Sequence, residues 1–167
     1  MRLALAWSGG KDSALALHAL RTAGRAPSVL LTTVTEGVER ISIHGVRREL
    51  LHAQAAALGL PVVEVRIPPP CPNEVYEQRM AEALAAPPLD AVDEIAFGDL
   101  FLEDVRAYRE DDAQLLADLP ATVDRCGENG AFHTFVHAGP IFEAPIAVTT
   151  GGLVERDGFA YRDIVPA

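Results

Sequence analysis

The chain of 167 residues has few cysteines, no long apolar run and few basic residues. Its two cysteines, Cys71 and Cys126, are too few for a disulfide scaffold, and no nearby spacing of His or carboxylate residues completes a metal site with them. No apolar run approaches the length of a membrane span, and the first residues lack the basic-then-apolar pattern of a signal peptide. A cytoplasmic protein with no membrane partner is therefore expected.

The shortage of basic residues also limits the partners of the protein. Lys and Arg together number 14 against 24 Asp and Glu, which gives a formal net charge of -10. Such a chain is not expected to bind nucleic acid over a broad surface, although a local basic site is compatible with this charge. Apolar residues make up 49% of the chain, which predicts one globular domain with a real core, and we find no repeat, low-complexity tract or long linker.

The densest motif lies near the N-terminus, between an apolar run and a helical run, and reads Ser8, Gly9, Gly10, Lys11, Asp12 and Ser13. Two glycines without Cβ atoms allow the backbone to turn sharply and to approach a ligand closely. The helix that follows begins with unpaired N–H groups and a partial positive charge, which together favour an anion. Lys11 adds a cation, and Asp12 is placed either to cap the helix or to hold a metal ion beside phosphates.

A Gly-Gly turn before a capped helix occurs in many domains, but six consecutive polar residues of this kind favour a phosphate site. The motif differs from the Walker A loop, which has four residues between its glycine and Gly-Lys-Ser/Thr, and it is not G-x-G-x-x-G.

The rest of the chain alternates between strand and helix patterns. Strands are expected at residues 2–7, 29–34, 61–67 and 95–97, and helices at residues 11–23, 46–58, 74–84 and 102–119. Residues 35–45 are expected to form a loop, and Asn73 to cap the helix after the proline-rich stretch. Repeated strand-helix units predict an α/β fold with a Rossmann-like, doubly wound parallel sheet.

The C-terminal part has a different pattern. Residues 146–154 and 159–165 resemble strands, and the Asp157-Gly158 pair between them is a hairpin signal. We therefore expect a nucleotide-binding α/β core at residues 1–120 and a small antiparallel β element at residues 121–167 within the same domain.

Several polar features follow the expected strands. They are the 8–13 motif, Thr33 with its neighbour Thr32, the loop through His44, and Gly98 with Asp99. In open α/β sheets, ligands bind outside the carboxyl ends of the strands, near the point where the strand order reverses. These features are therefore expected to lie around one ligand.

A second cluster follows the last expected helix and runs from Cys126 through Gly127, Glu128 and Asn129 to Gly130, with His133 and Thr134 shortly after it. It is either a glycine-rich turn that enters a strand or a loop that brings Glu128 to the ligand.

Several motifs resemble known proteins. The 8–13 motif looks like the pyrophosphate-binding loop of the N-type ATP pyrophosphatases, the PP-loop superfamily. The C-terminal signature around Glu128, together with Ser42-Ile43-His44 and Ala96-Phe97-Gly98-Asp99-Leu100, resembles the diphthine–ammonia ligase family over nearly the whole chain. The resemblance implies an adenine nucleotide alpha hydrolase-like fold and an ATP-dependent, adenylating ligase that forms an amide. Its acceptor is a carboxylate on a small molecule or a protein, and its nitrogen source is ammonia.

The resemblance also implies a set of site residues. The expected catalytic residues are Lys11, Asp12, Asp99 and Glu128, of which Asp12 and Asp99 would hold Mg²⁺. The expected ATP contacts are Trp7, Ser8, Gly9, Gly10, Lys11, Asp12, Ser13, Thr33, His44 and Gly98. The expected substrate contacts are Arg106, Arg109, Asn129, Gly130, His133 and Thr134, although the two arginines could instead pair with Glu103 and Glu110.

Two departures from the family keep other functions open. Ala131 stands where the family usually has a second glutamate, and the chain is shorter than its relatives between Glu110 and Leu119. Both favour a non-catalytic nucleotide-binding module or a plain nucleotide hydrolase as the alternative. Cys71 and Cys126 match in number the cysteine pair of sulfur-transferring relatives, but no RNA-binding patch accompanies them. A homodimer is compatible with the sequence.

Overall fold

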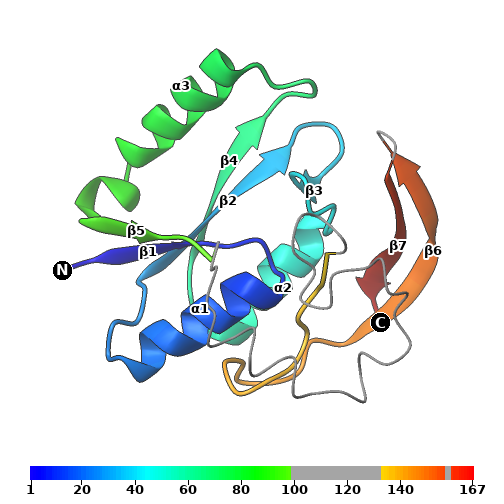
Figure 1. Cartoon of the computed structure of the whole chain (residues 1–167), viewed down its shortest axis with the longest axis horizontal. Coiled ribbons are helices and arrows are strands. Elements are labelled where there is room, and N and C mark those ends of the chain that lie inside the picture. The colour runs from blue at the N-terminus through cyan, green and yellow to red at the C-terminus, as the bar shows by residue number, and fades with distance from the viewer. Residues whose placement is uncertain (99–132, 157–158) are drawn as a thin grey trace, which may run out of the picture.

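A mostly parallel sheet forms the centre of the fold (Figure 1). The computed structural model describes residues 1–98, 133–156 and 159–167. Its parallel strands lie side by side in the order β4 (Val62–Ile67), β2 (Val29–Thr35), β1 (Leu3–Ala6) and β5 (Glu94–Ala96). From β1 the chain first proceeds to β2 and β4 on one side and then crosses to β5 on the other. The predicted Rossmann-like fold is confirmed, and the order reverses between β1 and β5.

Helices cover both faces of the sheet (Figure 1). α1 (Lys11–Thr22) and α2 (Arg48–Leu58) lie on one face, and α3 (Asn73–Leu84) lies on the other with the short helix η1 (Leu89–Ala91). Successive residues of β2 therefore face different cores: Leu30 packs in the core on the α1 and α2 side, and Leu31 packs in the other. Because both faces are buried, the strand reads as a continuous apolar run.

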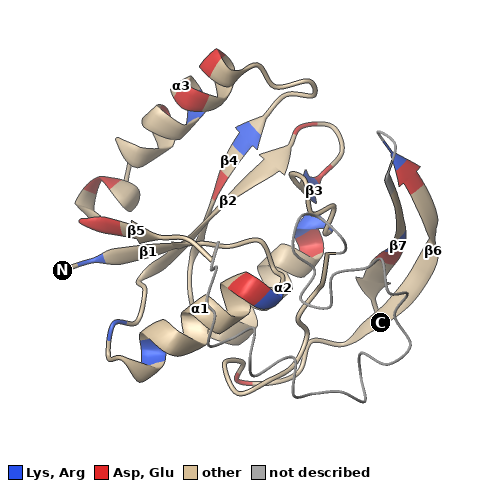
Figure 2. Ribbon diagram, viewed as in Figure 1, with Lys and Arg blue, Asp and Glu red and all other residues tan. Residues whose placement is uncertain are grey.

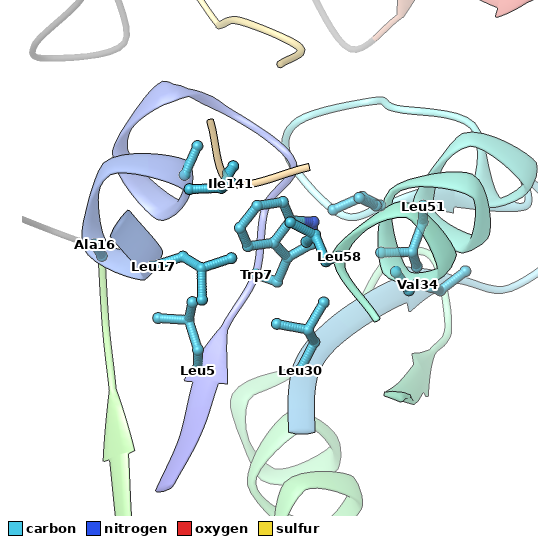
Figure 3. Packing of buried hydrophobic residues seen from close by; sticks show 12 residues of the cluster. Leu5, Trp7, Ala16, Leu17, Leu30, Val34, Leu51, Leu58 and Ile141 are labelled. Atoms are coloured by element: carbon cyan, nitrogen blue, oxygen red, sulfur yellow. The ribbon is translucent and has the colours of Figure 1, made fainter. Parts of the chain in front are cut away.

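The larger core surrounds Trp7, the single tryptophan of the chain (Figure 3). Its indole is 2% exposed and lies between Leu17 of α1 and Leu58 of α2. Ile141, from the C-terminal part, packs into the same cluster. The chain beyond residue 132 therefore belongs to the core on the α1 and α2 side.

Several sequence predictions differ from the structure in detail. The segment predicted as a loop at residues 35–45 contains a short strand, β3 (Arg40–Ile41), which pairs antiparallel with the end of β2. β3 forms because β2 extends past the end of β1 and leaves that edge available for pairing. α2 begins at Arg48, two residues later than predicted. The prediction that Asn73 caps α3 is wrong, since Asn73 is its first helical residue and Pro72 is the N-cap.

The C-terminal hairpin is confirmed. β6 (Val148–Arg156) and β7 (Phe159–Pro166) form a two-stranded antiparallel sheet that lies beside α2 and β3 (Figure 1). The predicted helix at residues 102–119, the turn at Asp157-Gly158 and the proposed boundary at residue 120 lie outside the described residues and stay predictions. In the described part of the chain, no helix is long and apolar enough to cross a membrane.

Charges of both signs are distributed over the described ribbon (Figure 2). Acidic and basic positions are mixed around β3, the start of α2 and the tip of β4, where Glu39 and Glu64 pair with Arg48 and Arg66.

Candidate nucleotide site

Residues 8–13, here called loop 8–13, lie where the order of the strands reverses. The loop follows β1, and β5 ends beside it, so that Gly98 lies against the first turn of α1. A Cβ atom on Gly98 would lie 2.9 Å from the Ser13 nitrogen and 3.0 Å from the Asp12 carbonyl carbon. The two strand ends therefore converge at the position that the sequence predicts for a ligand.

Hydrogen bonds within loop 8–13 set its shape. The Gly10 N–H donates to Ser8 Oγ at 3.4 Å, and the Ser13 hydroxyl donates to the Gly10 carbonyl at 3.0 Å. The two serine hydroxyls lie 3.2 Å apart. Gly9 has a φ of +79°, a conformation that favours glycine. The loop is thus built as a preformed turn at the start of α1.

Gln54, which was not predicted from the sequence, stabilises this turn through hydrogen bonds. It is fully buried on α2, and its Nε2 donates to the Gly9 carbonyl at 3.0 Å and to the Val136 carbonyl at 2.8 Å. Its Oε1 accepts the Trp7 indole N–H at 3.0 Å. A polar residue in line with Leu51 and Leu58 on the buried face of a predicted helix is the sequence signal that could have found it.

Replacing Gln54 by leucine is expected to loosen the loop. Gln54→Leu leaves the buried Trp7 N–H and the Val136 carbonyl without this partner, which should lower the free energy of unfolding by about 2–3 kcal/mol. Denaturation followed by the fluorescence of the single tryptophan measures this loss. Gln78→Leu, on an exposed pair with Glu82, is the matched control and should change stability by less than about 0.5 kcal/mol. Equal effects of the two substitutions would contradict a structural role for Gln54.

Residues 133–136 run alongside loop 8–13. The Val136 N–H donates to the Gly9 carbonyl at 2.9 Å, and the Lys11 N–H donates to Thr134 Oγ1 at 2.8 Å. Thr134 thus satisfies an N–H of the first turn of α1, whose N-cap Gly10 has no side chain to do so. The ring of His133 lies 4.5 Å from that of His44, centroid to centroid, at 31°. The structure therefore brings His44, His133 and Thr134 to the loop.

Lys11 and Asp12 form an ion pair at the mouth of the loop. Lys11 Nζ lies 2.6 Å from Asp12 Oδ2, and the side chains are 18% and 46% exposed. No group of three His, Cys, Asp or Glu residues arranged for a metal is present among the described residues. One exposed carboxylate beside a phosphate-sized loop fits Mg²⁺, which is commonly held by one or two carboxylates and the phosphates of its nucleotide.

Trp7 and Thr33 have partners within the fold, and other predicted site residues lie outside the described chain. The Trp7 indole is buried in the core, where its N–H donates to Gln54 Oε1, and the Trp7 backbone N–H donates to the Leu31 carbonyl. Thr33 lies on β2, where its carbonyl accepts the Ser42 N–H. The predicted residues outside the described part are Asp99, Arg106, Arg109, Glu128, Asn129 and Gly130.

A cleft of about 470 Å³ opens at the start of α2 and does not include loop 8–13. Its lining residues are Val38, Glu39, Arg40, Arg47, Arg48, Glu49 and His52. The arginines pair with carboxylates, as Arg48 does with Glu64 at 2.7 Å. Loop 8–13 differs from this cleft in its glycine turn at the start of α1.

Comparison with known proteins agrees with this geometry. No curated protein matches the chain. The family described as the diphthamide synthase N-terminal domain matches residues 1–112, which include loop 8–13, His44, Gln54 and Gly98. It is a PP-loop family of the ATP pyrophosphatase type. Since the match covers most of the chain, and the fold and the loop agree with it, the chain belongs to the family of diphthamide synthase N-terminal domains.

Proposed function

We propose that the protein is an ATP-dependent ligase that adenylates a carboxylate and converts it to an amide with ammonia. The observation that carries the proposal is loop 8–13, a preformed turn at the strand reversal that lies at the N-terminus of α1, where a helix favours an anion. Membership in a PP-loop family supports ATP as the nucleotide.

The proposed reaction has two steps. An oxygen of the acceptor carboxylate attacks the α-phosphorus of ATP, the bond from that phosphorus to the bridging oxygen breaks, and pyrophosphate leaves. Ammonia then attacks the acyl carbon of the adenylate, AMP leaves with the electron pair of the broken bond, and the nitrogen loses a proton. Mg²⁺ would offset the charge of the departing pyrophosphate.

Residues of the described chain take definite parts in this scheme. Backbone N–H groups of loop 8–13 and the positive end of α1 hold the phosphates that leave. Asp12 provides the described carboxylate for Mg²⁺, and Lys11 is then available to the phosphate oxygens. His133 precedes Thr134, which accepts the Lys11 N–H, and its ring lies against that of His44, so we assign both imidazoles to contacts with the acceptor. Asp99 and Glu128 remain predicted contributors.

The test is to identify the products with ATP labelled on its α-phosphate, Mg²⁺, ammonium and candidate carboxylates, including an elongation factor that carries diphthine. We expect labelled AMP and pyrophosphate in equal amounts, and release that depends on both acceptor and ammonium. Hydroxylamine in place of ammonium should trap the acyl group as a hydroxamate. ADP as the product would overturn the proposal.

A non-catalytic nucleotide-binding module is the second candidate, and Ala131 favours it because the family usually has a glutamate there. This candidate predicts tight binding of Mg²⁺ and ATP without turnover for any acceptor. Release of AMP and pyrophosphate that needs no acceptor would instead indicate a plain nucleotide pyrophosphatase. The same assay therefore separates the three functions.

A further inference from the structure

The C-terminal hairpin is fastened to the core at Asp163 of β7. This carboxylate is 6% exposed and lies between two arginines. Arg40 Nη1 donates to its Oδ1 at 2.8 Å, and Arg47 donates to its Oδ2 from Nη2 at 2.7 Å and from Nε at 3.1 Å. Charge-assisted, bidentate contacts of this kind are among the strongest hydrogen bonds in proteins.

The two arginines stand at the two ends of one loop. Arg40 belongs to β3 and Arg47 is the N-cap of α2. The segment between them, from Ile41 at the end of β3 to Val46, is here called loop 41–46, and its base is tied to the hairpin. Arg40 Nη1 also donates to the Gly45 carbonyl at 2.8 Å. The ring of Tyr161 on β7 packs beside Gly45, where a Cβ atom would lie 3.4 Å from Tyr161 Cζ.

Loop 41–46 contains a strained residue. Ile43 has a φ of +69°, which is rare for a β-branched side chain, and it is 90% exposed. Since its side chain gains almost no burial, packing of Ile43 itself does not offset the strain. A strained backbone persists where the surrounding structure over-determines it, and such residues gather at functional sites. The hydrogen bonds of Asp163 to the two arginines that flank the loop and the contact of Tyr161 with Gly45 contribute to that constraint, together with backbone hydrogen bonds inside the loop.

The next residue of the loop reaches the nucleotide site. His44 follows Ile43, and its ring lies against His133, which precedes the Thr134 that binds the Lys11 N–H. The loop conformation therefore determines where the His44 ring lies relative to loop 8–13.

We propose that Asp163 is a positioning residue of the nucleotide site, which ties Arg40 and Arg47 together and thereby holds Ile43 in its left-handed conformation and His44 against His133. The part of this proposal that concerns the nucleotide rests on the proposed function. The ion pairs of Asp163 with Arg40 and Arg47 persist at neutral pH, because hydrogen bonds from Arg40 and then Arg47 hold the pKa of the Asp163 carboxyl well below its usual range. Its contribution to stability is present above about pH 4 and is lost as the pH falls toward the folded-state pKa.

If Asp163 only attached the hairpin to the core, it would not strain loop 41–46. A double-mutant cycle measured by thermal denaturation distinguishes this purely structural role from the proposed one. Asparagine tolerates a positive φ, so Ile43→Asn should raise the Tm of the full chain by about 2–4 °C through relief of strain. In an Asp163→Asn background the released loop relaxes, so Ile43→Asn should raise the Tm by less than half as much. Equal gains in both backgrounds would overturn the proposal.

Two further variants control this cycle. Val148→Ala shortens a side chain of the hairpin opposite Pro166, and it should leave the full rise in Tm from Ile43→Asn unchanged. Arg47→Gln keeps the contact between Arg40 and Asp163, and it serves as the milder background if Asp163→Asn does not fold. A reduced gain in the Val148→Ala background would show that any weakening of the hairpin has this effect, which would also overturn the proposal.

Binding at the candidate nucleotide site is tested by isothermal titration calorimetry, in which α,β-methylene-ATP is titrated into the protein in the presence of Mg²⁺. Asp163→Asn should bind the nucleotide about tenfold more weakly than the native chain, whereas Val148→Ala should bind it equally well. Native affinity in Asp163→Asn would overturn the positioning role. If the native chain does not bind the nucleotide, the proposed function fails with the nucleotide part, while the thermal cycle still decides whether Asp163 strains the loop.

Discussion

Gly9→Ala is expected to abolish binding of Mg²⁺ and ATP and to lower the free energy of unfolding by about 2–4 kcal/mol. Two independent effects combine at this position. The φ of +79° disfavours any residue with a Cβ atom, and that atom would lie 2.7 Å from Gln54 Oε1. The Gln54 side chain is fully buried and makes three hydrogen bonds, so it has little room to move. The backbone of loop 8–13 must shift instead.

Gly24→Ala separates these two effects. Gly24 has a φ of +71°, but nothing lies within 4 Å of the Cβ position that alanine would fill. The control should therefore cost about 1 kcal/mol, from the backbone conformation alone, and leave nucleotide affinity unchanged. Denaturation and titration with α,β-methylene-ATP measure both quantities. If Gly9→Ala behaves like Gly24→Ala, the close contact between Gly9 and Gln54 is not important for the site.

The sequence predicted those parts of the site that depend on neighbouring residues. Loop 8–13 could be recognised because glycines, hydroxyls and a cation follow one another between a strand and a helix. The parallel order of the strands followed from the repeated strand-helix pattern, because few topologies satisfy it. The helix predicted at residues 46–58 ends at Leu58 as predicted, and Gly59 caps it with a φ of +66°.

The residues that the sequence did not reveal act over long separations. Gln54 binds carbonyl groups 45 and 82 residues away, and Asp163 binds arginines 123 and 116 residues away. Nothing in the local pattern around either residue indicates its partner. The two-residue strand β3 was missed for the same reason, since it exists only because the edge of β2 is available there. Local chemistry therefore predicted the loop, whereas its supports required the fold.

Several of these hydrogen bonds join residues inside the region that the family matches to residues beyond it. The matched region ends at residue 112, yet Val136 and Thr134 hold loop 8–13 directly and Asp163 holds the loop that carries His44. The C-terminal part is thus an integral support of the nucleotide site. A fragment cut at the end of the matched region would lose the Val136 N–H that binds the Gly9 carbonyl and the Thr134 hydroxyl that binds the Lys11 N–H.

Lys11→Met should lower kcat for the release of AMP and pyrophosphate by about 100- to 1000-fold while leaving the fold intact. Methionine keeps most of the length of the side chain and removes only the charge that would stabilise the leaving phosphates. The effect on stability should be below about 1 kcal/mol, because the pair with the half-exposed Asp12 is partly screened by solvent. Initial rates with saturating ATP and acceptor measure kcat, and thermal denaturation checks the fold.

Arg25→Met is the matched control for Lys11→Met. Arg25 also forms an ion pair, with Glu94, but these side chains are 51% and 42% exposed, and Glu94 pairs with Leu3 at the start of β1, the end opposite to the one that leads into loop 8–13. Its substitution should leave kcat within about twofold of the native value, because a remote exposed charge contributes little to the site. Lys11→Arg restores the charge with a wider group and should recover part of the lost activity. Native kcat in Lys11→Met would show that the leaving phosphates are stabilised by backbone N–H groups and Mg²⁺ without this ammonium group.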